Sequence, residues 1–320
     1  MFRKRSFYTF IFAFICIIGI TSCHSNKKQA STESFTSGDI KIAVDENFKP
    51  IIDEEIKVFE ALNPEATITP IYCSEVDALN LLLKDSVRLA IVTRTLSQGE
   101  LQNFKNKQYP VYQDKLATDG LGLIVNRSNK DTLITVDQVR DILTGKVTKW
   151  KQLAPSSGLG DIQVVFDNPN SSTVRYAIDS ICNGKPFDKS RIFAQKTNLQ
   201  VFNYVMHTKN AIGIIGVNWL DEENDTTNLS FKKGVNVMSV TTSNIATSES
   251  CLKPYQAYLA LQTYPFTRSV YTICSDPRDQ GLAHGFSNFL TTDKGQRIIL
   301  KSALVPATQP VRLVQVKDSY

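Results

Sequence analysis

After residue 39, short apolar segments alternate with amphipathic ones, and this alternation is the strongest constraint on the fold. The segments IKIAV, ATITPIY and VRLAIVT are typical of buried strands. Between them, residues 51–62 and 76–84 carry apolar side chains at helical spacing, and Asn63 and Pro64 end the first of these helices. A strand–helix–strand order predicts βαβ units around a mostly parallel sheet, so the sequence predicts an α/β fold.

The same alternation continues through the rest of the chain. Further strands are predicted at residues 120–126, 162–166, 211–216 and 268–274. Further helices are predicted at residues 135–143, 174–182 and 281–301, the last as one long or two short helices. Residues 220–228 are acidic and polar and are predicted to form a surface loop. With 320 residues, the chain is long enough for two lobes.

The first 22 residues differ in composition from the rest. Arg3, Lys4 and Arg5 precede an uncharged stretch, rich in Phe and Ile, that runs to Ser22. A basic start, a short apolar stretch and small residues at its end are typical of an export signal. Cys23 follows directly, which resembles a bacterial lipobox and implies that Cys23 becomes the lipid-modified first residue of the mature chain. The alternative is an uncleaved membrane helix, because the uncharged stretch is near the lower length limit for a span.

Either interpretation places most of the chain outside the cytoplasm. Residues 24–38 are polar and lack apolar periodicity, so we expect a flexible tether over residues 23–38. Removing the signal lowers the formal net charge from +5 to +2, because three basic residues leave with it. A charge so close to zero argues against an extended polyanion-binding surface and excludes nucleic acid as the partner.

Four cysteines remain in the mature chain after Cys23: Cys73, Cys182, Cys251 and Cys274. An exported compartment permits disulfides, and four cysteines allow three pairings that the sequence cannot separate. Small buried thiols are an equally good interpretation. No pair has CxxC spacing, which makes a zinc or thioredoxin-like role improbable.

Three strand-to-helix turns are the informative places for function, because open α/β sheets bind ligands at the carboxyl ends of their strands. These turns cover residues 44–50, 91–97 and 166–176. In the third, Ser171, Ser172 and Thr173 offer hydroxyl and backbone N–H groups at the positive end of a helix dipole, which suits an anion. The alternative is ordinary N-capping, for which Asn170 or Ser171 would suffice.

Longer motifs at these turns and elsewhere identify a family. The most characteristic are DILTGKVTKW and YPFTR; the others, in chain order, are NFKP, VRLAIVTRTLS, DGLGLIVNRSN, NSSTVRY, AIGIIG and FLTTDKGQRIILKSALVPAT. Together they resemble the phosphate-binding proteins of ABC transporters, the PstS family, over almost the whole mature chain. The resemblance implies a class II periplasmic-binding-protein fold: two lobes, each a mixed, mostly parallel sheet flanked by helices, with a ligand cleft between them. Residues 39–122 and 240–320 would form one lobe and residues 123–239 the other.

The resemblance also implies a binding site. In that family, short loops at helix starts hold the anion, and the matching positions here are Asn47, Phe48, Thr93, Arg94, Ser171, Ser172 and Thr173. The implied ligand is inorganic phosphate or a similar small anion. The implied partners are an ABC permease or another membrane protein of the cell envelope.

The chain also departs from the family pattern. Asp167 stands where the family often has an Arg, Ser172 replaces a Gly, and Arg94 replaces an Asp that accepts the proton of hydrogen phosphate. Three further carboxylates lie on loops near the expected cleft: Asp45, Glu46 and Glu75. Each carboxylate beside a phosphate costs on the order of 1–4 kcal/mol. A second hypothesis therefore stands beside phosphate binding: an envelope sensor or scaffold lipoprotein whose site has diverged.

An enzyme is not expected. The chain has only His24, His207 and His284, and it lacks HExxH, GxSxG and Walker motifs. His207 is predicted at a helix end and His284 near a helix start, where structural roles are more common. No cluster with metal-ligand spacing is present, so neither a metal nor a cofactor is expected.

Overall fold

The computed structural model describes residues 33–310, apart from residues 189, 191 and 223–229. The predicted signal segment, Cys23 and residues 24–32 of the predicted tether lie outside the described residues, as does most of the predicted loop at 220–228. Within the described part of the chain, no helix has the length and apolar character needed to cross a membrane.

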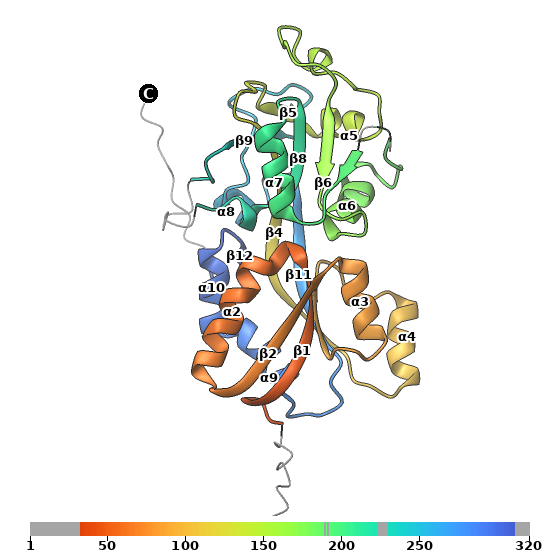
Figure 1. The fold of residues 1–320 in the computed structure, drawn as a ribbon, viewed down its shortest axis with the longest axis vertical. Helices are drawn as coiled ribbons and strands as arrows, with labels where there is room; N and C mark the ends of the chain where they lie inside the picture. Colours follow the sequence, from red (N-terminus) through yellow and green to blue (C-terminus); the bar gives the residue numbers. More distant parts are fainter. Residues whose placement is uncertain (1–32, 189, 191, 223–229, 311–320) are drawn as a thin grey trace, which may run out of the picture. The chain divides into compact units, whose positions relative to one another are not determined.

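Strands and helices alternate along the chain as predicted (Figure 1). The strands are β1 (Ser37–Asp45), β2 (Glu65–Cys73), β3 (Leu89–Val92), β4 (Tyr112–Asn126), β5 (Leu133–Thr135), β6 (Gln163–Phe166), β7 (Ile192–Ala194), β8 (Ala211–Gly216), β9 (Val235–Val237), β10 (Ser239–Thr241), β11 (Thr267–Cys274) and β12 (Val305–Pro306). The helices are α2 (Lys49–Leu62), α3 (Glu75–Leu83), α4 (Gln98–Asn106), α5 (Val136–Leu143), α6 (Ser172–Tyr176), α7 (Asn198–His207), α8 (Gln256–Ala260), α9 (Leu282–Thr291) and α10 (Asp293–Lys301).

The N-terminal strands form a parallel unit that is covered on both faces. β1 pairs in parallel with β2 and with β3, and α2 and α3 make the two connections. Ile42 and Val44 pack into one hydrophobic cluster, with α2, α9 and α10, whereas Ala43 packs into another, with α3 and α4. This division follows from the strand itself, because successive side chains point to opposite faces. The predicted βαβ arrangement is therefore confirmed.

One long strand connects the two halves of the main sheet. The order of the strands along the sheet is β2-β1-β3-β11-β4-β8-β6-β7, with β9 and β12 also paired to β4. β4 pairs antiparallel with β11 through residues 112–120 and antiparallel with β8 through residues 121–125. Beyond β8, β6 and β7 continue in parallel, flanked by α5, α6 and α7 (Figure 1). The predicted α/β class, with a mixed sheet flanked by helices, is confirmed.

The predicted helices agree with the structure to within a few residues in most places. Residues 281–301 form two helices, α9 and α10, which meet at Thr292. The helix predicted at 174–182 begins earlier, at Ser172, and its second half is a π-helical turn over Ala177–Ile181. α4 has no counterpart among the predicted helices, because Phe104 is its only buried residue and its sequence therefore lacks a clear apolar stripe.

All four cysteines of the described residues are free thiols. Cys182, Cys251 and Cys274 are buried, and Cys73 is partly buried. The interpretation of these residues as small buried thiols therefore describes this structure better than a disulfide does.

Candidate functional site

Two strand-to-helix turns bring most of the predicted site residues together. β1 ends at Asp45, whose carboxylate accepts the backbone N–H of Asn47 at 3.1 Å and so folds residues 46–48 into a short 3-10 turn. β6 ends at Phe166, and five residues later the Ser171 hydroxyl caps α6 by accepting the backbone N–H of Val174 at 3.2 Å. Both turns follow the carboxyl ends of strands, which is where ligand sites form in open α/β sheets.

Asn47 lies at the centre of this arrangement and contacts both turns. Its side-chain Nδ2 is 3.0 Å from Asp45 Oδ1, 3.3 Å from Asp167 Oδ2 and 3.3 Å from the Ser172 hydroxyl. Its Oδ1 accepts from the Thr173 hydroxyl at 3.2 Å. Asn47, Ser172 and Thr173 are completely buried. One amide thus joins residues that are more than a hundred positions apart in sequence.

Arg268, which is not among the site residues predicted from the family resemblance, completes the group. Arg268 Nη1 donates to the Ser172 hydroxyl at 2.9 Å, and its Nε and Nη2 lie 2.8 Å from Asp119 Oδ2. Arg268 and Asp119 are directly opposite one another on β11 and β4, so the sheet register fixes the ion pair. Arg268 belongs to the YPFTR motif and Asp119 to the DGLGLIVN motif. Attention to these two motifs could therefore have identified both residues from the sequence. We refer below to these residues as the polar cluster: Asp45, Asn47, Asp119, Asp167, Ser171, Ser172, Thr173 and Arg268.

The remaining predicted residues lie around the polar cluster or point away from it. Phe48 is buried beside it, with its ring centroid 5.7 Å from the Arg268 guanidinium. Thr93 donates its N–H and hydroxyl to Glu75 at 2.8 and 2.7 Å, and Arg175 binds both Glu75 and Thr93. Arg94 instead forms two hydrogen bonds of 2.8 Å with Glu100 at the start of α4. Its positive charge is therefore paired outside the polar cluster.

Charge is distributed unevenly in this region. Burial raises the pKa of Asp45, and raises the pKa of both Asp167 and Glu46 to about 7. Burial also disfavours the Glu75 carboxylate, but the hydrogen bond and charge of Arg175 outweigh it and lower the Glu75 pKa. Below about pH 7, therefore, Asp167 and Glu46 are mostly protonated and offer O–H groups, while Arg175 pairs with Glu75 and Arg268 pairs with Asp119.

Some buried acceptors of this region have no hydrogen-bond partner among the described residues. They are Asp45 Oδ2, Asp119 Oδ1, Asn198 Oδ1 and Asn218 Oδ1. The same Asn218 donates its Nδ2 to the backbone oxygen of Asn47 at 2.7 Å, and Trp219 Nε1 donates to that oxygen at 2.8 Å. An unsatisfied buried acceptor is costly, so these atoms favour a ligand that carries hydrogen-bond donors as well as acceptors.

A pocket of about 270 Å³ opens beside the polar cluster. Four carboxylates and one lysine are among the residues that line it: Asp45, Glu46, Asp77, Asp167 and Lys196. Of the four carboxylates predicted from the sequence to lie near the cleft, three line this pocket: Asp45, Glu46 and Asp167. Glu75 is the exception, because its carboxylate is bound to Thr93 and Arg175.

Comparison with known proteins identifies the family of this chain. Residues 29–294 match the family model described as PBP superfamily domain. The phosphate-binding protein PstS of Borreliella burgdorferi is 25% identical over 288 residues, which cover 87% of this chain and 92% of that protein. PstS of Staphylococcus saprophyticus is 22% identical over 266 residues, which cover 81% of this chain and 77% of that protein.

Solved structures share the fold. A Clostridium perfringens protein assigned to the phosphate ABC transporter substrate-binding proteins, with phosphate bound, superposes with a TM-score of 0.69 at 19% identity, covering 85% of this chain and all of that one. An ABC-type phosphate transport receptor from Vibrio cholerae superposes with a TM-score of 0.62 at 22% identity, covering 84% of this chain and all of that one. The two-lobed binding-protein fold and the resemblance to PstS are confirmed, while the lobe boundaries stay a prediction. Because the family model covers most of its length, the chain belongs to the PBP superfamily.

Proposed function

We propose that this protein is an exported, lipid-anchored solute-binding protein that binds phosphate or a similar oxyanion for an ABC uptake system. The observation that carries the proposal is the convergence of hydrogen-bond donors in the polar cluster. The Asn47 amide is within hydrogen-bond distance of the hydroxyls of Ser172 and Thr173, and the Arg268 guanidinium is within hydrogen-bond distance of the Ser172 hydroxyl. Such a set of donors suits a tetrahedral oxyanion. The PstS relatives and the phosphate-bound structural neighbour support the choice of phosphate.

Asp167 and Glu46 do not oppose this proposal below about pH 7. Both are then mostly protonated, so they carry no negative charge and can donate to phosphate oxygens. Asp119 is paired with Arg268 and Glu75 with Arg175, so neither faces a ligand without a counter-charge. Hydrogen phosphate also carries P–O–H groups that can donate to the unpaired Asp45 Oδ2, which sulfate at the same pH cannot do.

Solute reaches the buried cluster only if contacts between the two halves of the sheet separate. The bonds of Asn47 with Asp167 and Ser172, and that of Glu46 with Asn198 at 2.6 Å, would break on opening and be replaced by bonds to solute on closing. A hinge of this kind is the usual closure of two-lobed binding proteins. In this protein, therefore, solute competes with the protein's own hydrogen bonds.

Isothermal titration calorimetry at about pH 6 tests the proposal, because Asp167 and Glu46 are then mostly protonated. We expect saturable binding of phosphate and arsenate and much weaker binding of sulfate. Ser172→Asp should abolish binding by placing a negative charge within the polar cluster. Ser156→Asp, at an exposed loop position, adds the same charge elsewhere and should leave binding unchanged. If none of the three anions binds at any temperature tested, the proposal is wrong, and the sensor or scaffold alternative takes its place.

A further inference from the structure

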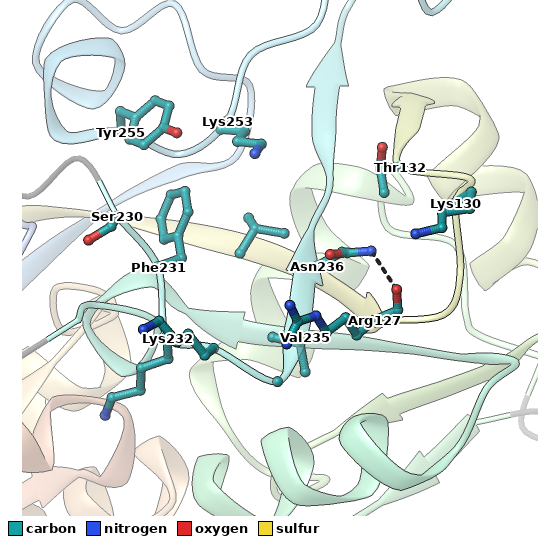
Figure 2. A pocket seen from close by; sticks show the side chains of 13 residues that line it. Arg127, Lys130, Thr132, Ser230, Phe231, Lys232, Val235, Asn236, Lys253 and Tyr255 are labelled. Atoms are coloured by element: carbon teal, nitrogen blue, oxygen red, sulfur yellow. Dashed lines mark hydrogen bonds between the residues drawn. The ribbon is translucent and has the colours of Figure 1, made fainter.

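A second pocket, separate from the polar cluster, is strongly basic (Figure 2). It has a volume of about 590 Å³ and is formed by three segments, at residues 127–132, 230–237 and 253–255. Five of the residues that line it are cationic: Arg127, Lys130, Lys232, Lys233 and Lys253. None of its described lining residues is Asp or Glu. We refer to this site as the basic pocket.

The basic pocket is held by the fold and is not a chance gathering of surface side chains. β9 pairs antiparallel with the end of β4, which sets Val235 opposite Asn126. The Asn236 side chain donates to the backbone oxygens of Arg127, at 3.2 Å, and Asn129, at 2.9 Å. On the opposite wall, the rings of Phe231 and Tyr255 stack with centroids 5.0 Å apart. These contacts fix the three segments relative to one another.

The positive charge of the basic pocket is largely unbalanced. Arg127, Lys130, Lys233 and Lys253 form no ion pair with any carboxylate of the described residues. Lys253 is half-buried, and the other three are exposed. These four like charges repel one another, and an anion in the pocket relieves that repulsion. The net charge of the chain does not reveal this local excess of positive charge, because it is a sum over all residues.

The Arg127 end of the basic pocket is remote from the polar cluster. Along the extended β4, Asp119 and Asn126 are about 23 Å apart at a rise of about 3.3 Å per residue, and Arg127 follows Asn126. A ligand the size of phosphate cannot contact both sites. The inference below therefore does not rest on the proposed function.

We propose that the basic pocket binds a small soluble anion that carries two or more phosphate groups. A single phosphate is too small to reach cations on all three segments, whereas a chain of phosphates can contact several at once. A membrane surface would meet the exposed Arg127, Lys130 and Lys233 but not the half-buried Lys232 and Lys253. The concave shape and a volume within the usual range of small-molecule sites favour a ligand that enters the pocket.

Calorimetry with inorganic tripolyphosphate at low ionic strength tests this proposal, because surface charge is least screened there. We expect one tripolyphosphate to bind per chain. The double variant Lys130→Gln, Lys253→Gln should weaken binding about 10-fold or more, because each lost charge removes a close attraction to the ligand. The matched control is Lys105→Gln, Lys294→Gln, on α4 and α10, where the same two charges are removed from exposed positions outside the pocket. Lys233→Gln, at an exposed position, provides a second variant should the double one fold poorly.

Three results would overturn the proposal. Equal weakening in the pocket and control variants would mean that tripolyphosphate senses only the diffuse charge of the surface. Loss of tripolyphosphate binding in Ser172→Asp would place the ligand in the polar cluster. Pocket-dependent binding to phosphatidylglycerol vesicles that tripolyphosphate does not displace would identify a membrane surface as the occupant. Failure of phosphate itself to bind would affect only the proposed function.

Discussion

Asp167 is the residue whose ionisation most directly opposes an anion in the polar cluster. Its carboxylate accepts from the Ser171 hydroxyl at 2.6 Å and contacts Asn47, and burial raises its pKa to about 7. Below that pH the group is neutral and can donate to a phosphate oxygen. Above it, the carboxylate repels the ligand by on the order of 1 kcal/mol or more. The affinity for phosphate should therefore fall as the pH rises through about 7.

Asp167→Asn separates this effect from the ionisation of phosphate itself. We expect the variant and the wild type to bind phosphate with similar affinity at about pH 5.5, and the variant to bind about 10-fold more tightly at about pH 8, since one pKa unit corresponds to a factor of about ten. The control Asp137→Asn removes the same charge from an exposed position on α5 and should not alter the profile. Calorimetric titrations across this pH range provide the measurement. Parallel profiles for Asp167→Asn and the wild type would contradict the prediction.

Glu55 presents a different case, a buried carboxyl with no role in the proposed site. It lies on the buried face of α2, is fully buried, and neither of its oxygens has a hydrogen-bond partner among the described residues. Burial raises its pKa to about 9. The folded protein therefore keeps the proton between about pH 4.5 and 9, whereas the unfolded chain releases it. The stability that this proton linkage contributes is complete below about pH 4.5 and is lost as the pH rises towards 9.

Glu55→Gln should remove that pH dependence. At about pH 8 we expect the variant to have a free energy of unfolding about 1–3 kcal/mol higher than that of the wild type, and at pH 4 nearly the same value, since a pKa unit is worth about 1.4 kcal/mol. Urea denaturation at several pH values measures the difference. Glu54→Gln is the matched control, because Glu54 is the exposed neighbour that pairs with Lys57. Identical pH profiles for the two variants would show that Glu55 does not hold its proton in the folded state.

At the scale of secondary structure, the elements that the sequence predicts well are those with an apolar repeat. The strands of AIGIIG and LAIV are buried at every position, and α2 carries a buried stripe that includes Ile52, Ile56 and Phe59. β4 is longer than predicted, because its first residues, YQDK, are mostly exposed and have no strand-like pattern. They form a strand because β11 supplies backbone partners, which is tertiary information.

The candidate site also has parts that the sequence predicts and parts that it does not. The loops around Asn47 and Ser171 can be located from sequence because they follow strands and carry the family motifs. The pairing of Arg268 with Asp119 depends on which strands become neighbours, and the pairing of Arg94 with Glu100 depends on α4, a helix with no counterpart in the sequence analysis. The local sequence pattern therefore locates the turns. Which charged side chains form ion pairs can be read only from the packed structure.

The turn after β8 offers an optical test of the polar cluster. Trp219 donates its indole N–H to the backbone oxygen of Asn47, whereas Trp150, the only other tryptophan, is buried and donates to Asn210 at 3.0 Å. We expect phosphate to change the intrinsic fluorescence through Trp219, because a ligand beside Asn47 alters the surroundings of that indole. Trp219→Phe should lose the change and Trp150→Phe should keep it. The reverse pattern in a phosphate titration would contradict the assignment of the site.

At the scale of the whole molecule, we propose that a lipid on Cys23 attaches the protein to a membrane. The lipobox-like motif that ends at Cys23 supports this proposal. Cys23→Ala should move the protein from the membrane fraction to the soluble fraction of lysed cells, while Cys16→Ala, within the same N-terminal segment, should not. Retention of Cys23→Ala in the membrane would instead favour an uncleaved hydrophobic helix.

The position of β11 has a consequence for how the protein acquires its function during synthesis. This strand comes from near the end of the chain yet lies in the middle of the sheet, between β3 and β4. Until residue 274 has emerged, those two strands lack their shared neighbour and expose unpaired edges, which favours aggregation. Arg268 arrives on the same strand, so a nascent or C-terminally truncated chain lacks the guanidinium of the proposed oxyanion site. If the proposed site is correct, completion of the sheet and assembly of that site are a single late event in the maturation of the protein.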